Sequence, residues 1–95
     1  MRDLENIFKA LGDETRLRIV EYLMKNGTHC VLEVAAALEL SQTRTSRNLG
    51  ILRDVGILRD ERRGACIDYS IDFIRLGTFG GCLKSALKEA FEINL

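Results

Sequence analysis

Three cysteines carry the most reactive side chains in this sequence: Cys30, Cys66 and Cys82. Cysteine thiolates bind thiophilic metal ions, and thiols can be oxidised to disulfide or polysulfide bridges. Because their number is odd and the first residues do not resemble a secretion signal, we expect no structural disulfide framework. A cysteine can also be a small buried apolar residue. The sequence therefore leaves three roles open for each thiol: ligand, redox partner or core.

A run of polar residues at positions 41–48 offers a second chemistry, the recognition of nucleic acid. Asn and Gln can pair with adenine and Arg with guanine, and the backbone amides at a helix N-terminus can hold a phosphate. We expect DNA contacts from every residue of this run: Ser41, Gln42, Thr43, Arg44, Thr45, Ser46, Arg47 and Asn48.

The distribution of charge supports this interpretation. The formal net charge of the 95-residue chain is zero, but positions 44–63 hold six arginines against three acidic residues. Two of them, Arg62 and Arg63, lie beside an expected hairpin turn, from which they would reach the DNA backbone or an adjacent groove. A local arginine surplus is typical of phosphate contact. A solvated charged surface is the alternative explanation.

The elements that must position these residues follow from the spacing of apolar residues and from the glycines that end or interrupt elements, since the chain has no proline. Helical spacing predicts four helices, with Asp13, Cys30 and Ser41 as the N-caps of the second, third and fourth. Glu33 stands three residues after Cys30, as in a capping box. Alternating apolar residues on both sides of Gly64 predict a hairpin, after which helical spacing returns. The expected order is helices over 3–11, 13–26, 30–38 and 41–56, a hairpin over 57–71, and one last helix over 72–91.

This order predicts a mainly α fold with a small β-hairpin, a winged helix-turn-helix. Residues 1–95 form a single domain, as the length suggests. No apolar stretch is long enough to cross a membrane, so we expect a cytoplasmic protein. Three glycines in the last helix, at positions 77, 80 and 81, would each weaken it by about 1 kcal/mol relative to alanine. Our hypothesis is that a second subunit packs closely against them.

Three segments together resemble the ArsR/SmtB family of metal- and thiol-responsive repressors. The segment from Phe8 to Ile19, FKALGDETRLRI, is similar to the opening signature of the family. The segment from Leu40 to Leu49, LSQTRTSRNL, resembles its recognition helix, and LRDVGIL, from Leu52 to Leu58, resembles its link into the wing. The resemblance covers about residues 4–71. It implies a homodimer built on the first and last helices, which binds an inverted repeat in double-stranded operator DNA until an inducer alters the dimer.

The resemblance also implies where an inducer would act. The arsenic- and cadmium-sensing branch places two cysteines, one residue apart, at the start of the third helix, whereas here Cys30 is followed by Leu32 at the second position. The zinc- and nickel-sensing branch uses histidines in the last helix, and the only histidine here is His29. Neither metal site is intact. We therefore expect an inducer site built from other combinations of Cys30, Cys66 and Cys82, in which Cys30 or Cys66 meets Cys82 across a dimer.

Three such sulfurs would bind trivalent arsenic or another thiophilic metal ion, and two could form a switchable disulfide or polysulfide bridge. The sequence keeps two alternatives open, a persulfide- or redox-responsive repressor and a winged helix that binds protein and has no sensor. We do not expect an enzyme. The nearest cysteines are 16 residues apart, and neither paired acids nor a phosphate-cradling glycine motif occurs.

Overall fold

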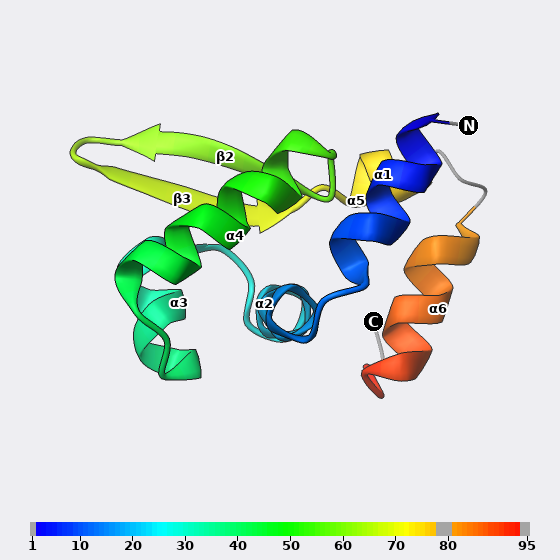
Figure 1. The fold of residues 1–95 in the computed structure, drawn as a ribbon, viewed down its shortest axis with the longest axis horizontal. Helices are drawn as coiled ribbons and strands as arrows, with labels where there is room; N and C mark the ends of the chain where they lie inside the picture. Colours follow the sequence, from blue (N-terminus) through cyan, green and yellow to red (C-terminus); the bar gives the residue numbers. More distant parts are fainter. Residues whose placement is uncertain (1, 78–80, 94–95) are drawn as a thin grey trace.

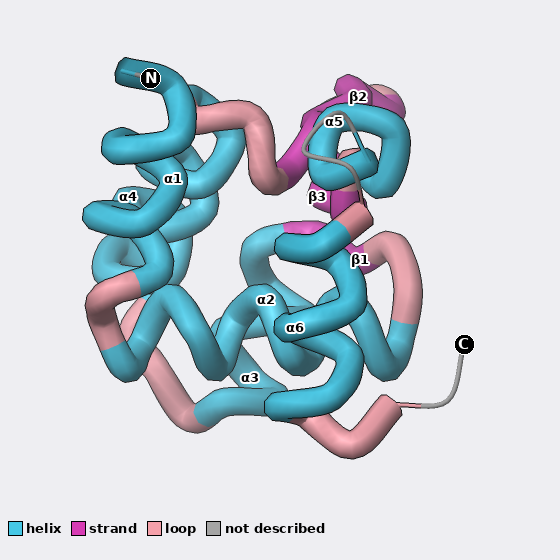
Figure 2. The backbone as a smooth tube through the Cα atoms, turned by 90° about the vertical axis from the view of Figure 1, so that its right-hand side faces the viewer, coloured by secondary structure: helices cyan, strands magenta, loops and turns pink. Residues whose placement is uncertain are grey.

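The computed structural model describes residues 2–77 and 81–93, which pack as helices around a short sheet (Figure 1). The α2 helix lies in the middle, and the β2–β3 hairpin projects beyond the helices on the side opposite α6 (Figure 1). A view turned by 90° places α6 across α2, with α1 beside them (Figure 2). The elements are α1 (Arg2–Leu11), α2 (Glu14–Asn26), β1 (His29–Cys30), α3 (Val31–Leu38), α4 (Gln42–Asp54), β2 (Leu58–Arg63), β3 (Cys66–Ile71), α5 (Phe73–Gly77) and α6 (Cys82–Ala90).

The expected N-caps occur at the helix starts. The Asp13 carboxylate accepts a hydrogen bond from the backbone N–H of Arg16 at 3.0 Å, and α2 then runs to Asn26. The Ser41 hydroxyl accepts from the backbone N–H of Arg44 at 3.1 Å, which fixes the start of α4. Each cap satisfies a backbone donor that has no partner inside its helix.

The α3 helix is short and defined at both ends. At its start the Glu33 carboxylate accepts from the backbone N–H of Cys30 at 3.0 Å, the reciprocal half of the expected capping box. At its end Glu39 has a left-handed backbone conformation, with φ 56° and ψ 46°. This conformation is rare for a residue with a side chain, and it turns the chain from α3 into α4 within three residues.

The sheet has three antiparallel strands in the order β1-β3-β2. The predicted hairpin is confirmed: Leu58 pairs with Ile71 at its base and Arg63 with Cys66 at its tip. The third strand, β1, was not predicted, because two residues are too few to show an alternating pattern. It pairs His29 with Tyr69 and Cys30 with Asp68.

The core lies between α2, α4 and the base of the hairpin. A hairpin of two strands is marginal alone, so β3 depends on packing against helices. The largest fully buried side chains come from five helices and one linker: Ile7, Ile19, Val20, Leu23, Val34, Thr45, Leu49, Leu52, Ile57 and Leu76.

The prediction of one continuous last helix was wrong. Helix α5 ends at Gly77 and α6 begins at Cys82. Gly81 precedes α6 with a left-handed φ of 79°, a conformation that glycine adopts without strain and that interrupts a helix. Gly80 lies outside the described residues. The apolar side chains of the two helices nevertheless face inward: Leu76 on α5 is buried, and so are Leu83 and Leu87 on α6.

Candidate nucleic-acid interface

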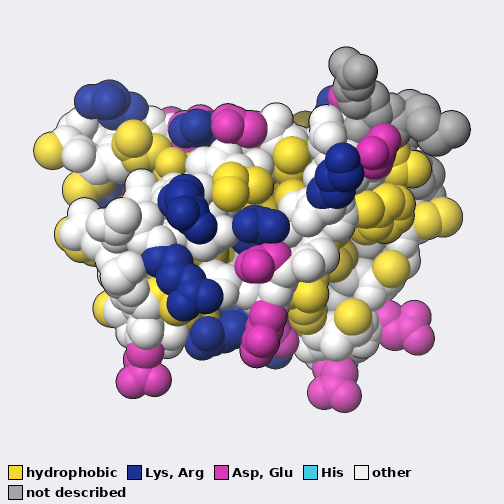
Figure 3. Space-filling view, in the orientation of Figure 1, with side chains coloured by type: hydrophobic (Ala, Val, Ile, Leu, Met, Phe, Trp, Pro, Cys, Tyr) yellow, Lys and Arg dark blue, Asp and Glu magenta, His cyan; other side chains and the backbone are white. Residues whose placement is uncertain are grey.

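The first two turns of α4 present a polar face to solvent. Helical spacing places Gln42, Thr43, Ser46 and Arg47 on the exposed side, and Arg44 beside them. In the space-filling view, Lys and Arg side chains gather over α4 (Figure 3). Ser41, Thr43, Arg44 and Arg47 line a shallow depression at this end of the helix. Such a surface offers hydrogen-bond donors and positive charge to phosphate oxygens and base edges.

Two residues of the predicted DNA-contacting run face the interior instead. Thr45 is fully buried, and its hydroxyl donates to the carbonyl oxygen of Ser41 at 2.9 Å. Asn48 is only 4% exposed; its amide donates to the carbonyl oxygen of Arg44 at 2.9 Å. Both side chains therefore hold α4 in shape and are not presented to a duplex.

An arginine of α2 completes this buried network and was missed from the sequence. The Arg16 guanidinium donates to the side-chain oxygen of Asn48 at 3.0 Å and to the carbonyl oxygen of Ala10 at 2.6 Å. It thereby joins α1, α2 and α4. Within the sequence, Arg16 looks like one more exposed helical arginine, so no local signal could have identified it.

The two arginines in the exposed part of α4 are held differently. The guanidinium of Arg44 donates to the hydroxyl of Thr15, on α2, at 2.7 Å. For Arg47 the described residues provide neither a hydrogen bond nor an ion pair, so its guanidinium has all its donors free for a ligand. Arg44 is thus positioned by the protein, and Arg47 extends from the helix.

Arg62 and Arg63 at the hairpin tip, which were both predicted to contact DNA, have different surroundings. Alternate strand residues point to opposite faces of a sheet. Arg63 binds Asp68 through two contacts of 2.7 and 3.3 Å, which lower the pKa of Asp68 and raise that of Arg63. Arg62 is exposed and has no such partner among the described residues. Arg62 is therefore the freer cation of the tip.

The hairpin is tied to α4 by Arg53. Its guanidinium contacts the carboxylate of Asp54 at 3.1 Å and that of Asp60, on β2, at 3.2 Å. These two hydrogen bonds raise the pKa of Arg53. The backbone N–H of Ile57 also donates to the carbonyl oxygen of Leu52 at 3.0 Å. The polar face of α4 and the hairpin thus have a fixed relative position.

The three cysteines are free thiols that lie in two places. Half-buried Cys30 and exposed Cys66 line one hollow, beside Gln42. Exposed Cys82 lines a separate hollow with Leu4 and Phe8. Neither exposed cysteine is part of the core. Within residues 2–77 and 81–93, no group of three or more His, Cys, Asp or Glu side chains could hold a metal ion.

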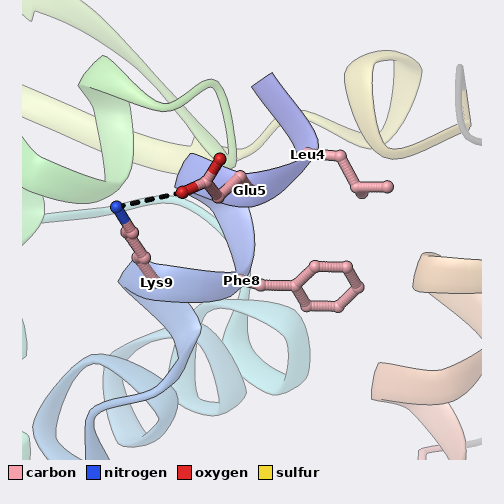
Figure 4. A pocket seen from close by; sticks show the side chains of 4 residues that line it. All are labelled: Leu4, Glu5, Phe8 and Lys9. Carbon is pink, nitrogen blue, oxygen red and sulfur yellow. Dashed lines mark ion pairs between the residues drawn. The ribbon is translucent and has the colours of Figure 1, made fainter. Parts of the chain in front are cut away.

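The second hollow belongs to a larger apolar surface on α1. Phe8 is 58% exposed. Leu4 and Phe8 extend from the same side of α1, toward α6, whereas an ion pair between Glu5 and Lys9 at 3.2 Å covers another side (Figure 4). Leu4 and Phe8 also line the hollow that faces Cys82 on α6. Several neighbouring apolar side chains at a surface, and not a single exposed one, indicate a contact surface.

Together, the helix pair α3–α4, the polar face of α4 and the hairpin with arginines at its tip define a winged helix-turn-helix protein. The expected fold class is confirmed. None of the helices in the described ranges is long and apolar enough to cross a membrane.

Comparisons with known proteins extend this classification. Residues 13–60 match the family described as bacterial regulatory protein, arsR family. The arsenic resistance transcriptional regulator ArsR1 of Pseudomonas putida is 45% identical over 65 residues, which cover 68% of this chain and 51% of that protein. This chain thus spans about half the length of that relative. The chain belongs to the arsR family of transcriptional regulators.

Two solved structures show the same fold. The AntR antimony-specific transcriptional repressor is 35% identical, with a TM-score of 0.65 over 87% of this chain and 78% of that one. The homodimeric winged helix-turn-helix DNA-binding domain of Mb0332 from Mycobacterium bovis is 28% identical, with a TM-score of 0.71 over 88% of this chain and 80% of that one.

Proposed function

We propose that this protein is a dimeric DNA-binding repressor that leaves its operator when an inducer acts on its cysteine thiols. The observation that carries the proposal is the exposed polar face of α4 beside an arginine-tipped hairpin that Arg53 holds in place. A recognition helix enters the major groove with its N-terminal turns against the bases. Here those turns carry Gln42, Thr43, Ser46 and Arg47 on the outside.

The contacts divide between base edges and phosphates. Gln42 and Arg47 are free to read base edges, since Asn48 serves the interior. Arg62 contacts phosphate or the adjacent groove from the hairpin tip, and Arg44 adds a positioned charge. The local arginine surplus makes this binding strongly dependent on salt.

The dimer forms through α1 and α6. Leu4 and Phe8 on α1 and Ala86 on α6 line an apolar hollow between the two helices, with buried Leu83 beneath it. The homodimeric domain from Mycobacterium bovis supports the formation of a dimer. A two-fold axis at this surface would set two recognition helices about 34 Å apart, one turn of DNA, so that they enter successive major grooves.

The inducer is a thiophilic species, trivalent arsenic or another soft metal ion. Two relatives, the arsenic resistance regulator ArsR1 and the antimony-specific repressor AntR, are named for elements that bind sulfur ligands. Two of the three thiols are exposed and the third is half-buried, so all are within reach of a reagent. An inducer lowers the affinity for the operator when it binds the DNA-free protein more tightly than the DNA-bound protein. The free energy of DNA binding is then weakened by the difference between the two inducer-binding free energies.

The replacement Arg47→Ala tests the DNA-binding surface. Duplexes would first be selected by the wild-type protein from a random pool, and binding would then be followed by fluorescence anisotropy at several salt concentrations. We expect Arg47→Ala to weaken binding about tenfold or more, because a good base-edge contact contributes roughly 1–3 kcal/mol.

Lys25→Ala removes the same charge and serves as the control. Lys25 lies about 15 Å further along α2 than Thr15, the α2 residue that binds Arg44. We expect this variant to bind like the wild type. Equal binding by Arg47→Ala and the wild type, or a wild type that selects no duplex, would contradict the proposal and favour a winged helix that binds protein.

A further inference from the structure

We propose that Cys30 and Cys66 of one chain form a two-thiol site for trivalent arsenic, in the hollow between α3, the start of α4 and the hairpin. The proposal rests on the proposed function, for which it names the inducer site. Sequence reasoning had paired either cysteine with Cys82 across a dimer. The fold instead brings Cys30 and Cys66 together within one subunit.

The register of the sheet brings the two side chains to one face. Cys30 on β1 is directly opposite Asp68 on β3. Paired residues in an antiparallel sheet share a face, and so do residues two apart on one strand. Cys66 stands two residues before Asp68, so it shares the face with Cys30 as its diagonal neighbour. Ile67 and Tyr69 alternate with them and face the other side.

The hollow exists because β1 is so short. After Cys30 the chain leaves the sheet to begin α3, and β1 pairs with β3 only at Tyr69 and Asp68. The edge of β3 at Cys66 and Ile67 is therefore left without a strand beside it on this side. Apart from the two thiols and Gln42, only apolar residues line the space.

The contacts of Arg63 agree with this register. It is directly opposite Cys66 in the sheet, and its guanidinium binds Asp68, the partner of Cys30. Arg63 therefore lies on the same face of the sheet as both cysteines.

The spacing favours an inserted atom over a direct disulfide. Diagonal neighbours in a sheet are roughly 7–8 Å apart, whereas disulfides usually need Cα atoms within about 6.8 Å. One arsenic atom between the sulfurs can bridge a wider gap than a direct S–S bond. Arsenite reacts without a change of oxidation state: As(OH)₃ and two thiols give (RS)₂AsOH and two waters. Two As–O bonds break, two As–S bonds form, and each thiol proton leaves in a water molecule.

The ligand count also selects this chemistry. No third His, Cys, Asp or Glu joins the pair into a metal-binding group within the described residues. Ions that require three or four protein ligands are therefore poorly served by one subunit. Arsenic bound by two thiolates keeps its third ligand as hydroxide from water.

The location connects arsenic binding to both DNA-contacting elements. Gln42 is the first residue of α4, and it lines the same hollow. Cys66 is paired with Arg63, the last residue of β2 at the hairpin tip. A bridge between Cys30 and Cys66 would fix the distance from α3 to the hairpin, and so would change how α4 and the hairpin fit a duplex.

The closing experiment measures arsenite binding to the reduced full chain in the absence of DNA, by native mass spectrometry and by the absorbance of As–S bonds. The variants are Cys30→Ser, Cys66→Ser and Cys82→Ser, each checked for folding by circular dichroism. We expect one arsenic per chain in the wild type and in Cys82→Ser. Either of the other variants should bind at least about tenfold more weakly, because the second As–S bond is then lost.

Three outcomes would overturn the site: no adduct in the wild type, a loss in Cys82→Ser, or full binding in Cys66→Ser. The proposed function is tested separately by adding arsenite to the protein–DNA complex. If arsenite still releases Cys66→Ser from DNA, the Cys30–Cys66 site is wrong but the repressor function stands. If the wild type binds arsenic and stays on DNA, the site stands but arsenic is not the inducer.

Discussion

Asn48 is a polar residue of α4 whose side chain is used entirely inside the protein. Its amide group donates to the carbonyl oxygen of Arg44 and accepts from Arg16, while Arg44 in turn binds Thr15. These contacts connect α2 with the helix that we propose reads DNA. The network therefore sets the orientation of the exposed side chains without contacting the ligand.

The first prediction concerns this residue. Asn48→Ala should reduce the free energy of unfolding by about 2 kcal/mol, because the half-buried guanidinium of Arg16 loses one of its two acceptors and the carbonyl oxygen of Arg44 loses a donor. Urea denaturation would measure the change. Ser46→Ala, two positions away and exposed, is the control and should change stability by less than about 0.5 kcal/mol. A similar small change for Asn48→Ala would show that the network contributes little.

Residue types alone could predict the segment that we propose reads DNA. They could not show which of its side chains are exposed and which are buried. Arg44 and Arg47 are the same type three residues apart, yet one binds Thr15 and the other has free donors among the described residues. Thr45 and Asn48 differ from Thr43 and Gln42 only in the direction in which the helix points them. Assigning those directions requires the position of α2, which no local pattern contains.

The start of α3 shows how one helix end organises its surroundings. The hydrogen bond from the backbone of Cys30 to Glu33 joins the end of β1 to the first turn of α3. The same bond lowers the pKa of Glu33 below its ordinary value of 4.5. A hydrogen bond that favours the ionised carboxylate makes the helix start sensitive to acid.

The second prediction is a pH dependence. The pKa of Glu33 is lower in the folded than in the unfolded chain, so its contribution to stability is present above about pH 4.5 and is lost as the pH falls through the folded value. Asp68, whose pKa is lowered by Arg63, adds to this loss at lower pH. The melting temperature should therefore fall on acidification.

Glu33→Gln isolates the contribution of the cap, because glutamine keeps the hydrogen bond and does not titrate. Melting curves from pH 7 to about pH 3 should fall less steeply for this variant than for the wild type. Glu89→Gln, on the exposed surface of α6, removes the same charge and should follow the wild type. Identical curves for Glu33→Gln and the wild type would contradict the prediction.

Element boundaries were predictable where caps and glycines mark them, and unpredictable where partners decide. The capped starts of α2, α3 and α4 all follow residue types that favour those positions. Strand β1 exists only because β3 offers it a partner, and two residues carry no periodicity. The division between α5 and α6 was missed because the apolar spacing continues across it, although the glycines had indicated a weak helix.

At the scale of the whole molecule, a small domain leaves apolar surface that it cannot bury alone. Half-buried Leu4 and exposed Phe8 lie where α1 approaches α6 (Figure 4). The sequence hypothesis had placed the subunit contact at the glycines of the last helix. Of these, Gly77 and Gly81 have no atoms of the described residues within 4 Å of an added Cβ, so no described neighbour requires their small size.

The third prediction is that Phe8→Glu dissociates the dimer. A buried Phe side chain contributes roughly 1.5–3 kcal/mol, so the dissociation constant should rise by about tenfold or more. Sedimentation at micromolar concentration would show a shift from dimer to monomer. Ala37→Glu, which adds the same charge at an exposed position of α3, should remain dimeric. A monomeric wild type, or a dimeric Phe8→Glu, would contradict the proposed interface.

The bond between Arg53 and Asp60 has a consequence for the kind of operator this protein can use. Because it joins α4 to β2, it favours one position of the hairpin relative to α4 within each subunit. In the proposed dimer, a change at the contact between α1 and α6 would then alter mainly the gap between the two DNA-contacting surfaces. We therefore expect substitutions at that contact to change the preferred half-site spacing of the DNA more than the preferred half-site sequence.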